Sequence, residues 1–129
     1  MPTPQELMQL GQTLIDHCKS HRETELQDKF YTADAVSVEA MPMPTGSTEA
    51  PGLDAIKAKN EWWYGAHDLH EMNIEGPFVH GSDRFSVIFD IDVTQKESGE
   101  RMQMREIATY HVNQDGKITR EEFAYAVGE

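Results

Sequence analysis

The chain has 129 residues, of which 38% are hydrophobic, and carries a formal net charge of −12 from 23 acidic and 11 basic residues. This length suits one domain over residues 1–129, and so acidic a chain repels phosphate backbones and anionic membranes, so we expect no nucleic-acid or membrane partner. Cys18 is the single cysteine, and no segment has the length of a membrane span or the pattern of a signal peptide, which together predict a soluble, cytoplasmic protein without an internal disulfide.

The first thirty residues predict two helices. Thr3 is placed to cap a helix, Pro4 suits the first helical position, and Glu6 is placed to reach back to the cap. A second short helix is expected over residues 23–30. The apolar residues of the first helix recur at helical spacing and predict one buried face: Leu7, Leu10, Leu14, Ile15 and Cys18.

A strand, a loop and a third helix are expected next. Residues 35–40 alternate as a strand does. Residues 41–52 contain three prolines and two glycines, which predicts a loop without regular structure at the mouth of the domain. A helix is then expected over residues 53–65, with Leu53, Ile56 and Trp63 facing the core.

The second half of the chain predicts strands. They are expected near residues 69–80, 84–94, 101–112 and 117–125, because apolar residues alternate with polar ones and turn residues separate the segments. Helices first and antiparallel strands afterwards predict an α+β fold, with N-terminal helices packed on one strongly curved, mostly antiparallel sheet.

Residues 30–39, FYTADAVSVE, carry a family resemblance. An aromatic pair that ends a helix, an Ala-Asp-Ala turn and a strand that ends on a carboxylate resemble the opening of the cone-shaped barrels named after nuclear transport factor 2. That superfamily includes ketosteroid isomerases and SnoaL-like polyketide cyclases. The segments 52–56, 76–89 and 116–125 follow in the order such a barrel requires. The resemblance implies a cone whose internal pocket takes a small apolar organic ligand without a cofactor, but the scaffold hosts enzymes and non-catalytic proteins alike.

Glu39 is the first candidate for catalysis. In ketosteroid isomerases the general base lies five residues after an aspartate that corresponds here to Asp34, which puts Glu39 at the base position. Apolar walls raise the pKa of such a carboxylate and make it a better proton acceptor near neutrality. The alternative is an exposed glutamate at a strand end. The donors with which that family stabilises an oxyanion correspond to Ile15 and Ala108, which donate nothing, so we do not expect steroid isomerisation by that mechanism.

Glu106 and Glu121 are further candidates, because each shares a strand face with apolar or aromatic residues. A carboxylate there must be paired, protonated or facing a wet pocket, since burying it bare costs several kcal/mol. If both faces line the cone, the two carboxylates and the Tyr110 phenol converge on one cavity, as acid–base chemistry requires. The alternative is a structural network in which an arginine neutralises one acid: Arg84, Arg105 or Arg120.

The segment WWYGAHDLH, residues 62–70, supplies aromatic and histidine candidates. His67 and His70 point to opposite sides of a strand, so we expect no metal site, and His70 is the better candidate for a proton shuttle in the pocket. Trp62 and Trp63 suit stacking on a flat ligand; the alternative is that one of them belongs to the core and the other forms a pocket lid or a dimer contact. Other apolar and aromatic residues on the inward faces are expected to contact the ligand: Phe85, Met104, Phe123 and Tyr125.

These features predict an enzyme that transfers protons in isomerisation, aldol-type cyclisation or dehydration. Glu39 is the expected base, Glu106 or His70 exchanges the second proton, and Tyr110 or Tyr125 donates to a carbonyl oxygen. The alternative is a non-catalytic ligand-binding or dimerisation module of the same fold, which the missing oxyanion donors favour.

The outer face of the sheet predicts a homodimer. Ile107, Thr109 and His111 lie on that face of the strand expected over residues 101–112. Apolar and neutral residues in an acidic chain are typical of a two-fold interface, and symmetric pairs are the commonest soluble homo-oligomers.

Overall fold

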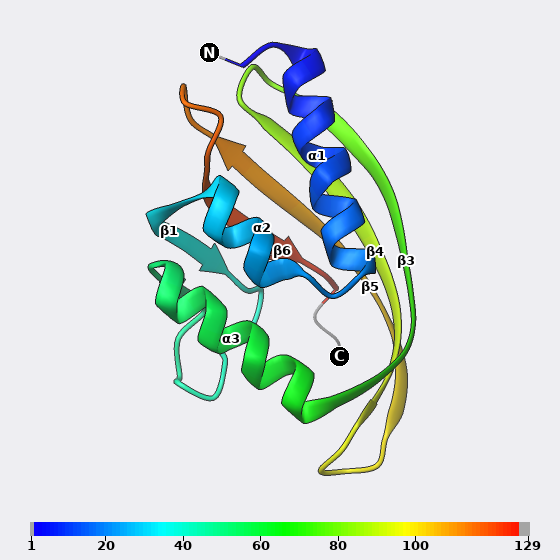
Figure 1. Ribbon diagram of the computed structural model, residues 1–129. Helices are drawn as coiled ribbons and strands as arrows, with labels where there is room; N and C mark the ends of the chain where they lie inside the picture. Colours follow the sequence, from blue (N-terminus) through cyan, green and yellow to red (C-terminus); the bar gives the residue numbers. More distant parts are fainter. Residues whose placement is uncertain (1, 127–129) are drawn as a thin grey trace.

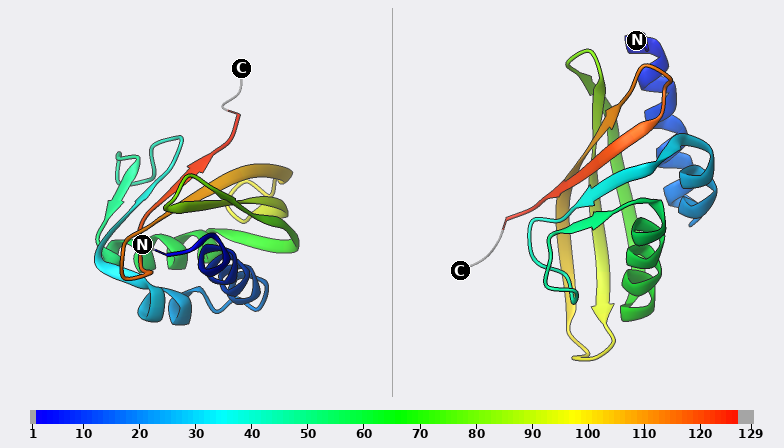
Figure 2. Two further views of the ribbon diagram at one scale, coloured as in Figure 1. Left: turned by 90° about the horizontal axis from the view of Figure 1, so that it is seen from above. Right: turned by 90° about the vertical axis from the view of Figure 1, so that its left-hand side faces the viewer.

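Three helices cover one face of a curved sheet in the computed structural model, which describes residues 2–126 (Figure 1). The elements follow one another as α1 (Pro4–Lys19), α2 (Glu23–Phe30), β1 (Tyr31–Val38), β2 (Glu49–Pro51), α3 (Leu53–Ala66), β3 (His67–His80), β4 (Arg84–Gln95), β5 (Arg101–Val112) and β6 (Ile118–Ala124). The two views of Figure 2 show that all three helices lie on the same side of the sheet. This is the α+β arrangement that the sequence predicts.

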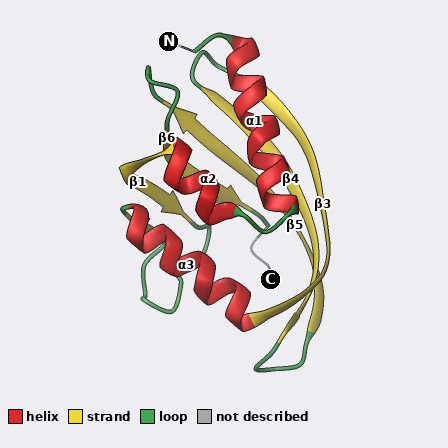
Figure 3. Cartoon of the chain, viewed as in Figure 1, coloured by secondary structure: helices red, strands yellow, loops and turns green. Residues whose placement is uncertain are grey.

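The sheet is mixed, with the strand order β2-β1-β6-β5-β4-β3. Strand β1 runs parallel to β6, and every other neighbouring pair is antiparallel. Figure 3 shows the long strands β3, β4 and β5 curving together past the helices. The sheet is therefore strongly curved and mostly antiparallel, as predicted, and its concave face is the one that the helices cover.

Helix α1 begins at the capping box that the sequence predicts. The backbone N–H of Glu6 donates to Thr3 Oγ1 at 3.1 Å, and the backbone N–H of Thr3 donates to Glu6 Oε1 at 2.9 Å. The helix lies close against the bend of β3 at Gly11, where a methyl group on the α-carbon would come within 2.5 Å of the Pro77 side chain. Its apolar stripe is buried, as expected. Helix α1 is thus fixed over one end of the sheet.

One expectation for residues 41–52 is wrong, because residues 49–51 form the short strand β2. This strand pairs with β1 through Ala50, which lies opposite Ser37. The loop is tied further by the backbone N–H of Glu39, which donates to the carbonyl oxygen of Thr48 at 2.7 Å. Strand β2 becomes the edge of the sheet and pairs with backbone groups of β1 that an edge strand would leave unpaired.

The core lies between α1 and the concave face, where Phe85, Val87 and Ala108 are fully buried. The alternation on β4 and β5 is as predicted: Phe85, Val87 and Ala108 are buried inside together with the acidic Glu106 on the cavity wall, and the apolar Ile107 is exposed on the outer face. No helix of the described residues is long and apolar enough to cross a membrane.

Candidate functional site

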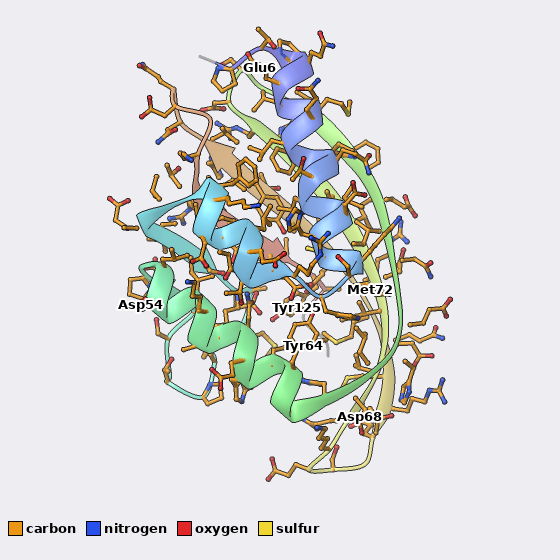
Figure 4. All side chains as sticks on the ribbon, viewed as in Figure 1. Glu6, Asp54, Tyr64, Asp68, Met72 and Tyr125 are labelled. Atoms are coloured by element: carbon orange, nitrogen blue, oxygen red, sulfur yellow. The ribbon has the colours of Figure 1, made fainter. Side chains whose placement is uncertain are left out.

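A cavity of about 280 Å³ lies between the helices and the concave face of the sheet. All three helices and strands from both halves of the sheet contribute to its wall. Figure 4 shows Tyr64 on α3, Met72 on β3 and Tyr125 after β6 around this space. Pockets for drug-sized molecules have volumes of roughly 300–1,000 Å³, and this cavity, just below that range, suits a small organic molecule.

The charged residues of the cavity wall are mostly acidic. Four glutamates and one lysine from residues 2–126 line the cavity: Glu23, Glu39, Glu106, Glu121 and Lys59. In the same part of the chain, no group of three or more His, Cys, Asp or Glu side chains is placed to hold a metal ion. The chemistry of the wall therefore depends on how each glutamate is paired.

Glu121 forms the buried floor of the cavity. Its side chain lies on β6 between Ser37 of β1 and Tyr110 of β5, and it is only 4% exposed. The Tyr31 hydroxyl donates to Glu121 Oε2 at 2.5 Å. Burial and the neighbouring Glu121 charge raise the pKa of both Tyr31 and Tyr110 well above the usual range of tyrosine, so both phenols keep their protons. Glu121 is thus held by a tyrosine.

Glu39 lies beside the ammonium group of Lys59. Lys59 Nζ is 3.4 Å from Glu39 Oε2, donates to Ser37 Oγ at 2.7 Å and lies 4.4 Å from the ring centroid of Phe123. The side chains of Lys59 and Glu39 are 9% and 17% exposed, respectively. Burial raises the pKa of Glu39 while Lys59 opposes the rise. The 3.4 Å contact is an ion pair without hydrogen-bond geometry, so Glu39 Oε2 has no hydrogen bond from any residue in the range 2–126.

Glu106 lacks such a partner. It lies on β5 next to Phe89 of β4, and no hydrogen bond or ion pair from the described residues reaches its carboxyl group. Burial, followed by the charge of Glu39, raises its pKa to about 7, and Lys59 offsets part of the rise. Near neutral pH both the protonated and the ionised form of the Glu106 carboxyl group are therefore populated.

Glu23 belongs to a hydrogen-bonded network of side chains between α2 and α3. The Tyr64 hydroxyl donates to Glu23 Oε1 at 3.1 Å, and His21 Nδ1 lies 3.4 Å from the same hydroxyl. Burial raises the pKa of Glu23, and burial with the nearby Glu23 charge raises that of Tyr64. Glu23 and Tyr64 of this network form part of the cavity wall on the side of α2 and α3.

Most residues that the sequence proposes for the site lie on the cavity wall: Glu39, Glu106, Glu121, Tyr110, Trp62, Trp63, Met104, Phe123 and Tyr125. His70 and Phe85 lie elsewhere, contrary to expectation. His70 is exposed and contacts Thr94 through Nε2 at 2.7 Å, because it sits where the register of β3 shifts. Phe85 is fully buried and stacks on Tyr110, with ring centroids 5.1 Å apart, so it belongs to the core.

The arginines that the sequence offers as partners for the inward acids pair elsewhere. Arg105 contacts Asp90, Arg84 contacts Asp83, and Arg120 contacts Glu122. These carboxylates are not on the cavity wall. The cationic partner in the cavity is Lys59 of α3.

The cavity wall also contains residues to which the sequence pattern assigns no role: Lys59, Glu23, Tyr31, Tyr64 and His67, the last considered only for a metal site. The spacing contained a signal for one of them. Ile56, Lys59, Asn60 and Trp63 follow one another at positions i, i+3, i+4 and i+7, which places all four on one helical face. That face is the one turned to the cavity and the core.

Comparison with known proteins identifies the family. A model of the SnoaL-like domain matches residues 7–125. A protein of Mesorhizobium loti, described as a candidate SnoaL-like polyketide cyclase, is 35% identical with a TM-score of 0.81 over 91% of this chain and 97% of its own. The chain therefore belongs to the SnoaL-like domain family, as the resemblance at residues 30–39 implies.

More distant structures share the fold. A Mycobacterium tuberculosis protein in complex with estradiol-17β-hemisuccinate is 19% identical, with a TM-score of 0.74 over 98% of this chain and 96% of its own. A Δ5-3-ketosteroid isomerase from Mycobacterium sp. is 21% identical, with a TM-score of 0.68 over 97% of this chain and 95% of its own. At these identities the likeness shows the fold alone. No curated protein matches the chain.

Proposed function

We propose that the chain binds a small, mostly apolar organic molecule in the cavity and transfers protons at a carbon next to a carbonyl group. This is the chemistry of an isomerase, a cyclase or a dehydratase. The aromatic wall and the cavity volume support ligand binding. The M. loti relative described as a candidate polyketide cyclase and the steroid-bound M. tuberculosis neighbour support the class of ligand.

A single observation carries the proposal: two carboxyl groups of one cavity lie in different electrostatic surroundings. Glu39 has the Lys59 ammonium beside it, whereas Glu106 has no partner among the described residues and a pKa of about 7. Such a difference separates the roles of base and acid in enzymes that use two carboxyl groups. Glu39 as carboxylate accepts the proton from the α-carbon, and Glu106 as carboxylic acid gives its proton to the carbonyl oxygen.

Two tyrosines add neutral donors to this arrangement. Tyr110 lies on the buried floor, and Tyr125 lies after the end of β6. Burial raises the pKa of each phenol, so both remain protonated and able to donate to an oxygen on the ligand. The proton is returned by the reverse steps, to a different carbon in an isomerisation.

Exchange of α-protons tests the proposal without knowledge of the natural substrate. 2-Tetralone is a flat bicyclic ketone, and NMR in D₂O follows the loss of its α-protons. We expect the protein to accelerate the exchange and Glu39→Gln to reduce the acceleration by about 10²–10⁴-fold, the usual contribution of a general base. Glu49→Gln is the matched control, because Glu49 is exposed on β2 and does not line the cavity.

The non-catalytic alternative has its own supporting observation. Lys59 holds Glu39 in an ion pair and Tyr31 holds Glu121 in a hydrogen bond, as structural roles require. If 2-tetralone binds without any acceleration of exchange, the cavity belongs to a binding module and the catalytic proposal is wrong.

We also propose that two copies pair through the convex face of the sheet. Ile107 is 49% exposed there, and Thr109 beside it hydrogen-bonds Ser86 at 2.8 Å. His111 on the same face contacts Glu122 at 2.7 Å, and Arg120 pairs with the same carboxylate at 3.1 Å. Light scattering at micromolar concentration should give twice the chain mass of 14.7 kDa, and the mass of a single chain would contradict the pairing.

A further inference from the structure

His67 is a cavity residue to which the proposed chemistry gives no task. It is the first residue of β3, directly after α3, and it is half-buried on the cavity wall. Its ring stacks on the indole of Trp63, with centroids 4.6 Å apart and an angle of 21° between the planes. His67 Nδ1 lies 2.9 Å from the carbonyl oxygen of Trp63. The ring is therefore fixed by two independent contacts.

The contact with the Trp63 carbonyl determines which nitrogen carries the proton. Trp63 is among the last four residues of α3, whose carbonyl groups have no partner within the helix. A carbonyl oxygen only accepts hydrogen bonds, so His67 Nδ1 must donate. In the neutral ring Nε2 then carries the lone pair, and no residue in the range 2–126 donates to it.

His67 also lies at a different end of the cavity from the carboxyl floor. Trp62, whose ring centroid is 6.4 Å from that of His67, is exposed to solvent, as is Met41 on the wall. Tyr31, Tyr110 and Glu121 are buried. The cavity thus has a buried floor and a partly exposed mouth, and His67 lies beside the exposed Trp62 at the mouth.

We propose that His67 determines specificity by accepting, at Nε2, a hydrogen bond from a hydroxyl group of the ligand. The ligand class is then a flat, largely apolar ring compound with a phenolic, enolic or alcoholic hydroxyl on the part that lies at the mouth. An ether, carbonyl or carboxylate oxygen at that point presents a lone pair to a lone pair and leaves Nε2 unsatisfied. The inference rests on the proposed function only in requiring that the cavity holds a ligand.

The state of the imidazole ring is tested first, in the protein alone. Long-range ¹H–¹⁵N NMR spectra at pH 8 distinguish a protonated ring nitrogen from one with a lone pair. We expect the protonated signal from Nδ1 of His67 and the lone-pair signal from Nε2. The opposite assignment overturns the inference, because Nε2 would then donate.

Two matched probes test the hydroxyl. 2-Naphthol has the O–H donor, and 2-methoxynaphthalene keeps the rings and the oxygen without it. Their dissociation constants can be measured from the indole N–H signals of Trp62 and Trp63, which both line the cavity. We expect 2-naphthol to bind roughly 5–10-fold more tightly, as one added hydrogen bond allows.

Two substitutions connect that preference to His67. His67→Phe keeps a ring against Trp63 but removes the acceptor, so the preference for 2-naphthol should disappear. His70→Phe is the matched control, because His70 is exposed outside the cavity, and the preference should remain.

The outcomes separate this inference from the proposed function. Equal affinity for the two probes in the unsubstituted protein overturns the role of His67 but leaves ligand binding and proton transfer intact. If neither probe shifts the indole signals, the cavity does not hold a flat ring compound, and this inference is wrong together with the proposed ligand class. If the protein does not accelerate α-proton exchange in 2-tetralone but still prefers 2-naphthol, only the catalytic proposal is contradicted.

Discussion

The two faces of strand β5 place neighbouring residues in opposite chemical surroundings. Arg105 points out from the convex face and pairs with Asp90 at 2.7 Å, whereas Glu106 points into the cavity without a partner in the described structure. On the same outer face Arg101 forms two hydrogen bonds with Asp92, which lower the pKa of that carboxyl group. Burial raises the pKa of Glu106 instead. Successive side chains of a strand point to opposite faces, so a solvated, paired charge outside and a desolvated acid inside belong to neighbouring residues.

The largest expected effect comes from removing the cation of the cavity. Lys59→Met leaves Glu39 buried beside other acids, and breaking a buried ion pair costs roughly 3–5 kcal/mol. We expect a loss of about 3 kcal/mol in the free energy of unfolding at pH 8, measured by urea denaturation.

The outer face supplies the control for that substitution. Arg105→Met breaks an exposed ion pair and should change stability far less than Lys59→Met. The double variant Lys59→Met/Glu39→Gln should recover part of the loss, because no unpaired charge remains. Equal losses from Lys59→Met and Arg105→Met would contradict the contrast between the two faces.

The second prediction concerns pH. The pKa of Glu106 rises from 4.5 to about 7 on folding, so the folded state binds more protons than the unfolded state between these values. Stability contributed by protonated Glu106 is then fully present below pH 4.5 and is lost as pH rises to about 7. We expect Glu106→Gln to unfold with a free energy roughly 2 to 3 kcal/mol higher than the unsubstituted protein at pH 8, and little different at pH 4.5.

Asp92 on the outer face has the opposite pH dependence, because hydrogen bonds from Arg101 lower its pKa below the ordinary 3.8. The stability it contributes is present above pH 3.8 and is lost as pH falls through its folded pKa. Asp92→Asn should therefore lose stability at neutral pH and not gain it. A gain in both variants, or a loss in both, would show that the two faces do not differ as described.

The floor of the cavity gives the third prediction. Tyr31→Phe removes the donor to Glu121 Oε2, and hydrogen bonds to charged groups contribute roughly 1.5–3 kcal/mol. We expect a loss of about 2 kcal/mol by chemical denaturation. Tyr64→Phe, which removes a longer contact to Glu23 at the wall, should cost less. The reverse order would contradict the tight pairing at the floor.

Two glycines provide the smallest effects. Gly65→Ala on α3 adds a methyl group with nothing within 4 Å, so it should stabilise the protein by up to about 1 kcal/mol through helix propensity. Gly11→Ala on α1 has the same propensity gain, but its methyl group meets Pro77 and should destabilise the protein. Thermal unfolding of the two variants distinguishes these signs, and a gain at Gly11 would contradict the close packing of α1 on the sheet.

Periodicity was sufficient to predict much of this arrangement from the sequence. The strand over residues 101–112 has the expected bounds, and its period of two places Glu106 inside and Arg105 outside. The position of Glu39 followed from the family resemblance at residues 30–39. The alternation of a strand and a short motif each involve only neighbouring residues. The inward direction of Glu106 and the position of Glu39 therefore could be predicted without knowledge of the tertiary structure.

The remaining parts of the site depend on tertiary structure. Tyr31 and Glu121 are 90 residues apart in sequence and meet only because β1 runs parallel to β6. His70 lies at the shift in register between Leu69 and Glu71, which removes it from the face that simple alternation predicts. Lys59 has the spacing of an inward residue, but lysines are mostly exposed, so spacing alone did not distinguish it.

Glu106, in the proposed function, is a desolvated acid that exchanges a proton within the cavity. A ¹³C NMR titration of the glutamate side-chain carboxyl groups tests this role, with the Glu106 signal assigned by its absence in Glu106→Gln. We predict a midpoint near pH 7 for Glu106 in the free protein, and a shift of that midpoint when 2-tetralone binds. A midpoint near the ordinary value of about 4.3, unchanged by the ketone, would contradict it.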